Sequence, residues 1–540
     1  MDIYYNFYRM RLYLPLIILL IIWLFVPAVK RAVYGISGKI DKCGTSKVAF
    51  FMGTISFVFS IMAIYPGKSW GGDFSQYFAQ ARALATGTVA EWYERNQFII
   101  NTSCDGIGAD VYPWFWAICL APFYKFFGYF PYTPLKILEA LAVAGTTITL
   151  VYIYKRRMKL LYAMFLAAFT AWNVNYIFYV NTIEADIICL FMVIETINIV
   201  DLYNRRSSKK LYYIYAVLSG IFIYFSVQTK TMAEGLLLAL VCYDALILLQ
   251  ALCKKTGVRN LFTIDSFEGQ LSFARLIPYI VYFVLTKITE WILPTAGGTY
   301  NGYFTVSLYR ISYGLQEYFK EFMTFWGGGT DRAIITALQM ALTILLLALT
   351  VIGSFVAFKK DSYMIIYLYG MAVMLLIYDY YRVGFIYTLF PIMLLLGFEG
   401  LKWLLRSMKI TFFKYQIGGM AFIVLFMTFL ASIYLCVNVR LCGYGNNEIE
   451  TVPTQDVFEY IRTNLTKDDV VYFFKPRVLY FYTDVSSYTW NDEPDKLVYA
   501  DYVLIDKWSN WNNVKEVLQD ENQYELSYSN DTYYLYKTLR

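Results

Sequence analysis

The sequence has no histidine among its 540 residues, and only 16% of them are charged. The lack of histidine excludes His-ligated zinc sites, histidine general bases and Ser-His-Asp triads. The eight cysteines are scattered without metal-ligand spacing. Cys436 and Cys442 are the one close pair on the predicted outer side, and whether they form a disulfide is an open alternative. No repeat of fixed period and no low-complexity linker is present. Any catalysis would therefore depend on carboxylates, Lys, Arg and Tyr.

Apolar residues dominate the chain, at 59% of the composition, and the mean hydropathy is +0.46. The charged residues lie in short clusters between apolar runs long enough to cross a bilayer core of about 30 Å. These features exclude a soluble multidomain enzyme and predict a polytopic α-helical membrane protein. Twelve segments are predicted to span the membrane: 13–29, 48–66, 134–154, 158–173, 185–203, 211–227, 232–252, 276–293, 333–357, 361–378, 384–401 and 415–437.

Basic residues predict which side of the membrane each loop faces. Half of them, 23 of 46, lie in connections that we expect to be cytoplasmic: 30–47, 155–159, 205–210, 253–275, 359–360 and 402–414. The outer face then carries 67–133, 174–184, 228–231, 294–332, 379–383 and 438–540. The first span is followed by Lys30 and Arg31 and has no cleavage-site pattern, so we expect an anchor rather than a removed signal peptide.

One apolar segment, Tyr112 to Phe130, is predicted not to cross. A crossing there would place the basic cluster at 155 on the outer side, and the segment is short and carries Pro113 and Pro122. We expect a helix that lies at the outer interface, with its Trp and Tyr side chains at headgroup level.

Charge divides the chain near residue 438. The tail, 438–540, has 10 basic and 17 acidic residues, net −7, whereas the remainder has 36 and 23, net +13. The basic excess belongs to membrane topology, so no nucleic-acid partner is expected. We predict three regions: an N-terminal anchor with its cytoplasmic loop (1–47), a transmembrane catalytic domain (48–437) whose first outer loop is 67–133, and an extracytoplasmic domain (438–540).

The tail is predicted to be a small α/β domain. Helix patterns occur at 454–465 and near 512–519, and strand patterns at 469–475 and 498–506. A hairpin is predicted to turn at Asn530-Asp531. About 100 residues are enough for an independent core.

Acidic residues mark two of the predicted outer segments. The first outer loop opens GGDFSQYFAQARALATG, where Asp73, Tyr77 and Gln80 share one helix face. This face predicts the wall of a site at the bilayer boundary, while the alternative is that Asp73 only stabilises the start of its helix. Glu184 and Asp186 begin a later helix, and the same alternative holds for them.

Basic residues occur at three further outer positions. Lys230, in SVQTKTMAEG, is one turn from Glu234, and a structural ion pair between them is the alternative to a ligand site. Arg382 is either a phosphate ligand or a cation whose long side chain reaches the membrane surface. Lys475 and Arg477, in FFKPRVLYFYTD, are candidates for the same site or members of a solvated basic turn.

The order of these motifs resembles the GT-C superfamily of membrane glycosyltransferases, in particular the family 39 group of protein O-mannosyltransferases and bacterial aminoarabinose transferases. The matching features are the GD-type acid Asp73, the "YPP-type" segment DVYPWFWAICLAPFYKFFG, the second-loop acid Asp186, the basic Lys230, the YDYYRVGFIYTLFPIMLLLGFEGL helix with Arg382 and Pro391, and the "KPR" stretch. The chain departs from the family pattern where Trp114 replaces the second proline, where Asp73 stands alone instead of an Asp-Glu pair, and where Lys230 replaces an arginine.

The resemblance implies a GT-C-like fold with juxtamembrane helices on the outer face, and transfer of a sugar from a polyprenyl-phosphate donor to an acceptor there. A phosphate is a good leaving group, so one general base suffices and inversion of the anomeric centre is expected. The roles implied are general base for Asp73, acceptor or sugar positioning for Asp186, Glu184 and Tyr77, and phosphate binding for Lys230, Arg382, Lys475 and Arg477. No metal ligand is assigned, and dependence on a divalent metal stays open, as do the sugar and the acceptor, which can be protein, lipid or cell-wall polymer.

Two other functions fit a chain with twelve helices. A lipid-linked sugar flippase or transporter would be expected to show internal repeats or charges at the membrane midplane, and it has little use for an outer domain of 103 residues. An O-antigen-type polymerase would share the donor lipid, but the acid-bearing first outer loop and the C-terminal domain argue against it.

Overall fold

The structure is a computed structural model. It describes residues 35, 38–68, 70–104, 107–205, 209–253, 273–295, 304–326, 333–378, 381, 383–407 and 449–539. The predicted spans 13–29 and 415–437, Arg382, and the cysteine pair Cys436 and Cys442 lie outside these residues.

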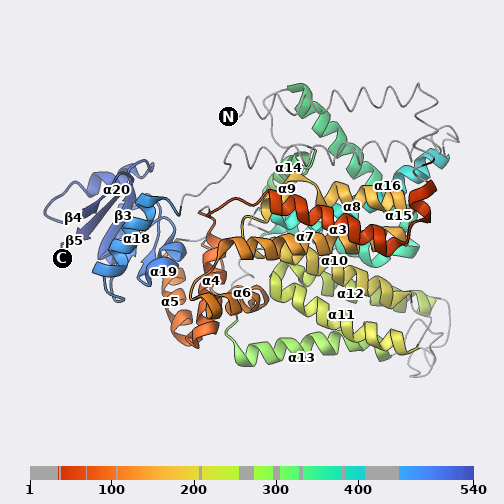
Figure 1. Ribbon diagram of the computed structural model, residues 1–540, viewed down its shortest axis with the longest axis horizontal. Helices are drawn as coiled ribbons and strands as arrows, with labels where there is room; N and C mark the ends of the chain where they lie inside the picture. The colour runs from red at the N-terminus through yellow and green to blue at the C-terminus, as the bar shows by residue number, and fades with distance from the viewer. Residues whose placement is uncertain are drawn as a thin grey trace.

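A bundle of helices forms most of the described chain, and a small α/β domain lies at one end of it (Figure 1). The helices are α3 (Thr45–Met62), α4 (Gly72–Thr86), α5 (Val89–Thr102), α6 (Trp114–Phe127), α7 (Tyr132–Lys155), α8 (Leu160–Ala171), α9 (Val174–Tyr179), α10 (Ala185–Asn204), α11 (Lys209–Thr229), α12 (Glu234–Cys253), α13 (Ile277–Ile292), α14 (Leu308–Thr324), α15 (Ala333–Ile377) and α16 (Phe390–Ser407). Short 3-10 helices, η1 (Thr231–Ala233), η3 (Phe273–Leu276) and η5 (Val383–Ile386), precede α12, α13 and α16.

Within the described ranges, five helical stretches are long and apolar enough to cross a membrane: Thr45–Met62, Tyr132–Lys155, Lys210–Thr229, Thr231–Leu249 and Thr336–Ile377. Helices α6 and α8 are apolar but shorter. Every predicted span that falls within the described residues contains a helix. The number of crossings and the side on which each loop lies stay predictions.

Helix α15 consists of two helices that meet at Asp361, whose φ of −128° and ψ of 26° are not helical. The Tyr369 hydroxyl donates to Ser354 Oγ at 3.1 Å although the two residues are 15 apart in sequence. In a straight helix that separation would be about 22 Å, too far for a tyrosine to bridge, so the chain reverses at Asp361. The reversal agrees with the two predicted spans 333–357 and 361–378.

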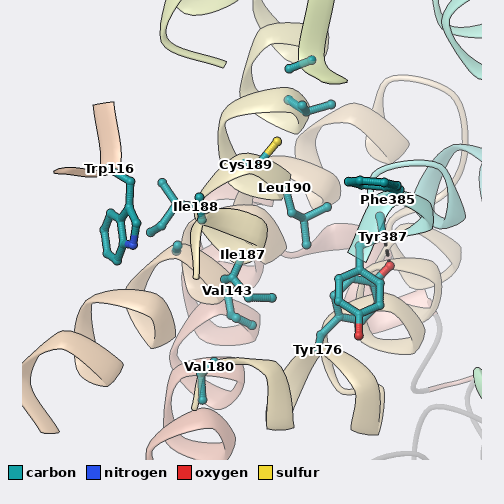
Figure 2. Packing of buried hydrophobic residues seen from close by; sticks show 14 of the residues in the cluster. Trp116, Val143, Tyr176, Val180, Ile187, Ile188, Cys189, Leu190, Phe385 and Tyr387 are labelled. Atoms are coloured by element: carbon teal, nitrogen blue, oxygen red, sulfur yellow. Dashed lines mark hydrogen bonds between the residues drawn. The ribbon is translucent and has the colours of Figure 1, made fainter. Parts of the chain in front are cut away.

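The core of the bundle surrounds the first half of α10. Figure 2 shows apolar side chains of α10, among them Ile187 and Leu190, between Trp116 and Tyr387. The Tyr176 hydroxyl donates to the carbonyl oxygen of Tyr387 at 2.9 Å, which satisfies a polar group inside this core. The packing therefore fixes the start of α10, where Glu184 and Asp186 lie.

The C-terminal domain is a five-stranded sheet in the order β2-β1-β3-β5-β4. Strand β1 (Val470–Tyr472) is parallel to β2 (Ser486–Tyr488) and β3 (Tyr502–Asp506), and β5 (Tyr533–Thr538) is antiparallel to β3 and to β4 (Tyr524–Ser529). The helices of the domain are α18 (Val452–Asn464), α19 (Pro476–Thr483), η6 (Pro494–Tyr499) and α20 (Asn512–Val517). The predicted α/β character and the hairpin turn at Asn530-Asp531 are confirmed.

Two details of the domain differ from the prediction. The strand predicted at 498–506 begins only at Tyr502, because Pro494 starts a 3-10 helix that continues to Tyr499. Helix α19 and strand β2 were not predicted, since the segment that follows Lys475 was interpreted only as a motif or a basic turn.

The domain is docked on the first outer loop, with α19 against α4 (Figure 1). Arg82 of α4 pairs with Asp484 at 2.7 Å, and Arg95 of α5 donates to the Asp484 carbonyl at 3.0 Å. The Trp490 indole donates to the carbonyl oxygen of Thr102 at 2.6 Å. The domain is thus held by the same loop that begins with Asp73.

Candidate active site

Asp73 lies in the first turn of α4, at the end of the bundle that faces the C-terminal domain. Its side chain is partly exposed, and its Oδ1 accepts a hydrogen bond from the Tyr112 hydroxyl at 2.8 Å. Tyr112 is 39 residues away in sequence, so the loop before α6 folds back onto α4. Asp73 therefore makes a specific contact in addition to its favourable position at a helix start.

The predicted common face of Asp73, Tyr77 and Gln80 is confirmed, and the whole face contacts Tyr112. Gln80 accepts from the Tyr112 backbone N–H at 3.0 Å and donates to its carbonyl at 2.9 Å. The ring centres of Tyr77 and Tyr112 are 5.1 Å apart. The Tyr77 hydroxyl donates to the Thr229 carbonyl oxygen at 3.3 Å. Tyr77 therefore links this wall to the end of α11, next to Lys230.

Arg477 enters this region from α19 of the C-terminal domain. Its Nη1 donates to the Tyr112 hydroxyl oxygen at 3.1 Å and its Nη2 to the Ala109 carbonyl at 2.6 Å. Gly108 has a φ of +102°, and a Cβ there would lie 2.8 Å from the Tyr112 oxygen and 3.2 Å from Arg477 Nη1. A glycine is thus needed at 108 both for the backbone conformation and for the approach of these two side chains.

Asp186, which is buried, and Lys230, which is partly exposed, form an ion pair between α10 and the end of α11. The alternative pairing of Lys230 with Glu234 is not formed, because the described Lys230 ammonium pairs with Asp186 instead. The Lys230 Nζ also lies 5.4 Å from the centre of the Phe385 ring, a cation–π distance. Gly384 packs directly against the Asp186 carboxylate, which brings η5 into the site.

Glu184, two residues before Asp186, faces the start of the first outer loop. One of its carboxylate oxygens lies 2.6 Å from the position of a Cβ built on Gly71, and Lys68 Nζ lies 3.6 Å from the same point. The preceding residue, Ile183, has a φ of +48°, a strained value for a β-branched side chain. Strain of this kind is typical of positions whose geometry serves a function.

Besides Tyr112, two charged site residues were missed at the level of the sequence. Glu139 of α7 is fully buried and lies within Coulombic range of Glu184, Asp186, Lys68 and Lys230. Neither of its carboxylate oxygens has a hydrogen-bond partner among the described residues. The signal was an ionisable residue inside a predicted transmembrane helix, which by itself indicates a functional site.

Lys68 is the second of these residues. It is 1% exposed, and its ammonium lies 4.6 Å from the centre of the Phe74 ring. Burial of a lysine is rare unless it is paired. Its place beside Glu184 therefore makes Lys68, like Lys230, a candidate cation of the site. The site therefore has a fully buried lysine, Lys68, in addition to the partly exposed Lys230 that the motifs predicted.

The structure does not bring every predicted residue together. Arg382 lies outside the described residues. Lys475 is only partly buried and directly precedes α19, two residues before Arg477. Among the described residues, no group of three or more Cys, Asp or Glu side chains is placed to hold a metal ion.

Comparison with solved structures shows a shared fold. The chain superimposes on ArnT from Cupriavidus metallidurans bound to undecaprenyl phosphate with a TM-score of 0.53 at 12% identity, over 91% of this chain and 97% of ArnT. The apo state of the same ArnT gives 0.54, with the same identity and coverage. The archaeal oligosaccharyltransferase AglB from Archaeoglobus fulgidus, in complex with an inhibitory peptide and a dolichol-phosphate, gives 0.49 at 10% identity, over 91% of this chain and 74% of AglB.

No family model matches the sequence, and no curated protein matches it. The relation to ArnT is therefore one of architecture, extending over nearly the whole of both chains. This protein shares the fold of ArnT.

Proposed function

We propose that this protein is a membrane glycosyltransferase that moves a sugar from a polyprenyl-phosphate donor to an acceptor on the outer face of the cell membrane. The observation that carries the proposal is the arrangement of Asp73, held by Tyr112, on the helix whose Tyr77 reaches the Thr229 carbonyl, next to the Lys230–Asp186 pair, in a chain with the fold of ArnT. ArnT, which has this fold, binds undecaprenyl phosphate, a lipid of the proposed donor class.

Asp73 is the general base in this proposal. The acceptor hydroxyl gives its proton to the Asp73 carboxylate while its oxygen attacks the anomeric carbon of the sugar. The bond between that carbon and the phosphate oxygen breaks, and the electron pair leaves with the polyprenyl phosphate. No acid is required because the phosphate leaves as an anion, and a single displacement inverts the anomeric centre, which NMR of the product measures.

Cations stabilise the charge that develops on the departing phosphate. Lys230 is the principal candidate because it pairs with Asp186 of the candidate site, and Arg382, Lys475 and Arg477 remain candidates for the same role. Asp186, Glu184 and Tyr77 position the sugar or the acceptor. Asp186 also orients the Lys230 ammonium in the absence of donor.

Asp73→Asn tests the proposed function. The variant is expected to lose transfer of a labelled hexose from polyprenyl phosphate, measured by chromatography, by about 100-fold or more because the base is removed. Glu94→Gln, which changes an exposed acid in the same outer loop, is the matched control and is expected to keep the wild-type rate.

The other functions give different results in this assay. A flippase would move the labelled lipid across the membrane without forming a new glycosidic bond. A polymerase would give a lipid-linked polymer whose yield does not depend on Asp73. Full transfer by Asp73→Asn, with normal membrane expression, would overturn the assignment of the base.

A further inference from the structure

Tyr112 is held on every side by residues of the candidate site. Gln80 binds its backbone N–H and carbonyl, and the Tyr77 ring lies beside its own ring. Its hydroxyl lies between Asp73 Oδ1, at 2.8 Å, and Arg477 Nη1, at 3.1 Å. Only 8% of Tyr112 is exposed. The hydroxyl is therefore fixed in position and cannot turn to other partners without disturbing this packing.

The direction of the two hydrogen bonds follows from their chemistry. A guanidinium has donors and no acceptor, so the Tyr112 oxygen must accept from Arg477. A phenol has a single proton, and that proton is then directed at Asp73. Asp73 must accept it, which an ionised carboxylate does well. Arg477 thus sets the donor-to-acceptor direction of a chain of two hydrogen bonds that ends on the Asp73 carboxylate.

Arg477 is provided by the C-terminal domain, 365 residues from Tyr112 in sequence. The domain is anchored to the first outer loop by contacts that do not involve this chain of hydrogen bonds, among them Arg82 with Asp484 and Trp490 with Thr102. Arg477 itself is 5% exposed and also binds the Ala109 carbonyl. Its position is therefore a property of the docked domain and not of a mobile side chain.

We propose that Arg477 is a positioning residue through which the C-terminal domain, acting by way of Tyr112, keeps Asp73 ionised and oriented as a base. The inference rests on the proposed function for the role of Asp73. It gives the domain a part in preparing the catalytic carboxylate, in addition to any part in acceptor recognition. The phosphate-binding role suggested by the motif is then left to Lys230 and to the other cations.

The consequence for pH dependence has a definite sign. A hydrogen bond donated to a carboxylate stabilises its ionised form, and donation from Arg477 strengthens the Tyr112 hydroxyl as a donor. Loss of either group raises the pKa of Asp73. The acid limb of the pH–rate profile, which rises as the base ionises, moves to higher pH by about one unit when the Tyr112 hydroxyl is lost and by less when only Arg477 is lost.

The test measures protonation of Asp73 directly in the full-length protein in detergent. A carbodiimide modifies protonated carboxyl groups, and mass spectrometry of the peptide that contains Asp73 gives the pH at half modification. We expect this midpoint to rise by about one pH unit in Tyr112→Phe and to rise by less in Arg477→Ala, because the phenol remains there. Adding Arg477→Ala to Tyr112→Phe should not move it further, since Arg477 acts through Tyr112.

Two further variants keep the test decisive. Arg477→Lys preserves the charge but not the two-pronged geometry, so an intermediate midpoint is expected even if Arg477→Ala folds poorly. Arg462→Ala, which removes an exposed arginine from α18 of the same domain, should leave the midpoint unchanged. An unchanged midpoint in folded Arg477→Lys and Arg477→Ala would overturn the proposal, as would additive shifts in the double variant.

The labelling result is independent of sugar transfer. If Asp73→Asn keeps full transfer while the midpoints shift as expected, the assignment of the base is wrong and the hydrogen-bond chain still stands. If Asp73→Asn loses transfer while the midpoints do not shift, the base stands and the role of Arg477 is wrong.

Discussion

Helix α7 joins two clusters of charged side chains that are partnered in different ways. Near its C-terminal end is the Arg157 cluster, which consists of Arg156, Arg157, Asp201, Arg205 and Asp361. Near its N-terminal end is the Glu139 cluster, which consists of Lys68, Glu139, Glu184, Asp186 and Lys230. Glu139 and Arg157 are 18 residues apart, which is about 27 Å along a helix and close to the thickness of a bilayer core.

Every charged residue of the Arg157 cluster has an ion-pair partner within the cluster, with three arginines facing two aspartates. Arg157 and Asp361, with side chains 1% and 2% exposed, approach to 2.6 Å. Asp201 forms ion pairs with Arg156 and Arg205, each at 2.7 Å, and also with Arg157. These contacts tie the ends of α7 and α10 to the point where α15 reverses. The cluster is a structural network whose charged groups form ion pairs with one another.

The Glu139 cluster has the same kinds of residues but is less complete. Glu139 is buried with no hydrogen-bond partner at either oxygen in the described part of the chain, and Ile183, next to Glu184, has a strained backbone. Both features cost stability, and proteins retain such costs mainly at functional sites. Ion pairing of every residue therefore indicates a structural role at one end of α7, and a buried carboxyl without an ion pair or a hydrogen bond in the described chain indicates a ligand site at the other.

The largest expected contrast concerns the side of the membrane on which each end lies. In a variant whose only cysteine is the exposed Cys43, before α3, a membrane-impermeant maleimide should label nothing in intact cells. In a variant whose only cysteine is introduced by Asp495→Cys, on the exposed surface of the C-terminal domain, labelling should be complete. Permeabilised cells should label both, and labelling of Cys43 in intact cells would reverse the predicted topology.

Neutralising the Lys230–Asp186 pair should abolish activity and spare the fold. The double variant Lys230→Met with Asp186→Asn leaves no unpaired charge behind, so the melting temperature should change little. Transfer should fall by about 100- to 1,000-fold because the departing phosphate loses its cation.

The matched control for that variant is a second ion pair, Arg275 with Asp244, 2.5 Å apart near the start of α13. The double variant Arg275→Met with Asp244→Asn should keep its rate per folded molecule within about twofold, because the pair lies outside the proposed site. Equal losses of activity in the two double variants would remove the functional distinction between them.

Breaking the Arg157 cluster should have the opposite result. Arg157→Ala leaves Asp361 and Asp201 without their most buried partner, so the free energy of unfolding should fall by about 3–5 kcal/mol. Denaturant titration in detergent measures this change, and transfer per folded molecule should be retained. Lys320→Ala, which removes an exposed partner of Glu317, should change the unfolding free energy by less than about 1 kcal/mol.

The contrast between the two clusters was only partly predictable from the sequence. Apolar length and basic loops predicted the helices of the bundle, and helical spacing placed Asp73, Tyr77 and Gln80 on one face. These are local properties of the chain. The partner of that face was not predicted, because Tyr112 reaches Asp73 only when a loop folds back, and Arg477 arrives from another domain.

Local patterns also misled at α19 and at Glu139. The segment PRVLYFYT is rich in aromatic residues and has no helical signal strong enough to separate it from a turn or a strand, yet it forms α19 against α4. Glu139 was not predicted as a site residue, because one acidic residue in an apolar run does not change the prediction of a transmembrane span. Its place inside a predicted span was a signal that the sequence contained, but only the tertiary structure shows which charges lie around it.

The smallest expected change in the free energy of unfolding is also the most direct test of whether the Glu139 carboxyl lacks a stabilising partner. Glu139→Leu removes a buried carboxyl that has no hydrogen-bond partner in the described structure, so the free energy of unfolding should rise by about 1–2 kcal/mol. Glu195→Leu is the control, because Glu195 accepts hydrogen bonds from Thr149 and Asn198, and its loss should destabilise by about 1–3 kcal/mol. Denaturant titration in detergent gives both values.

Transfer should change in the other direction from stability. Glu139→Leu should slow transfer by about tenfold, since the charge balance around Lys230 and Asp186 is altered. Stabilisation combined with slower transfer is the pattern expected where a site retains an unfavourable group for its chemistry. A loss of stability in Glu139→Leu would mean that this carboxyl supports the fold as Arg157 does. The Glu139 and Arg157 clusters would then both have a structural role.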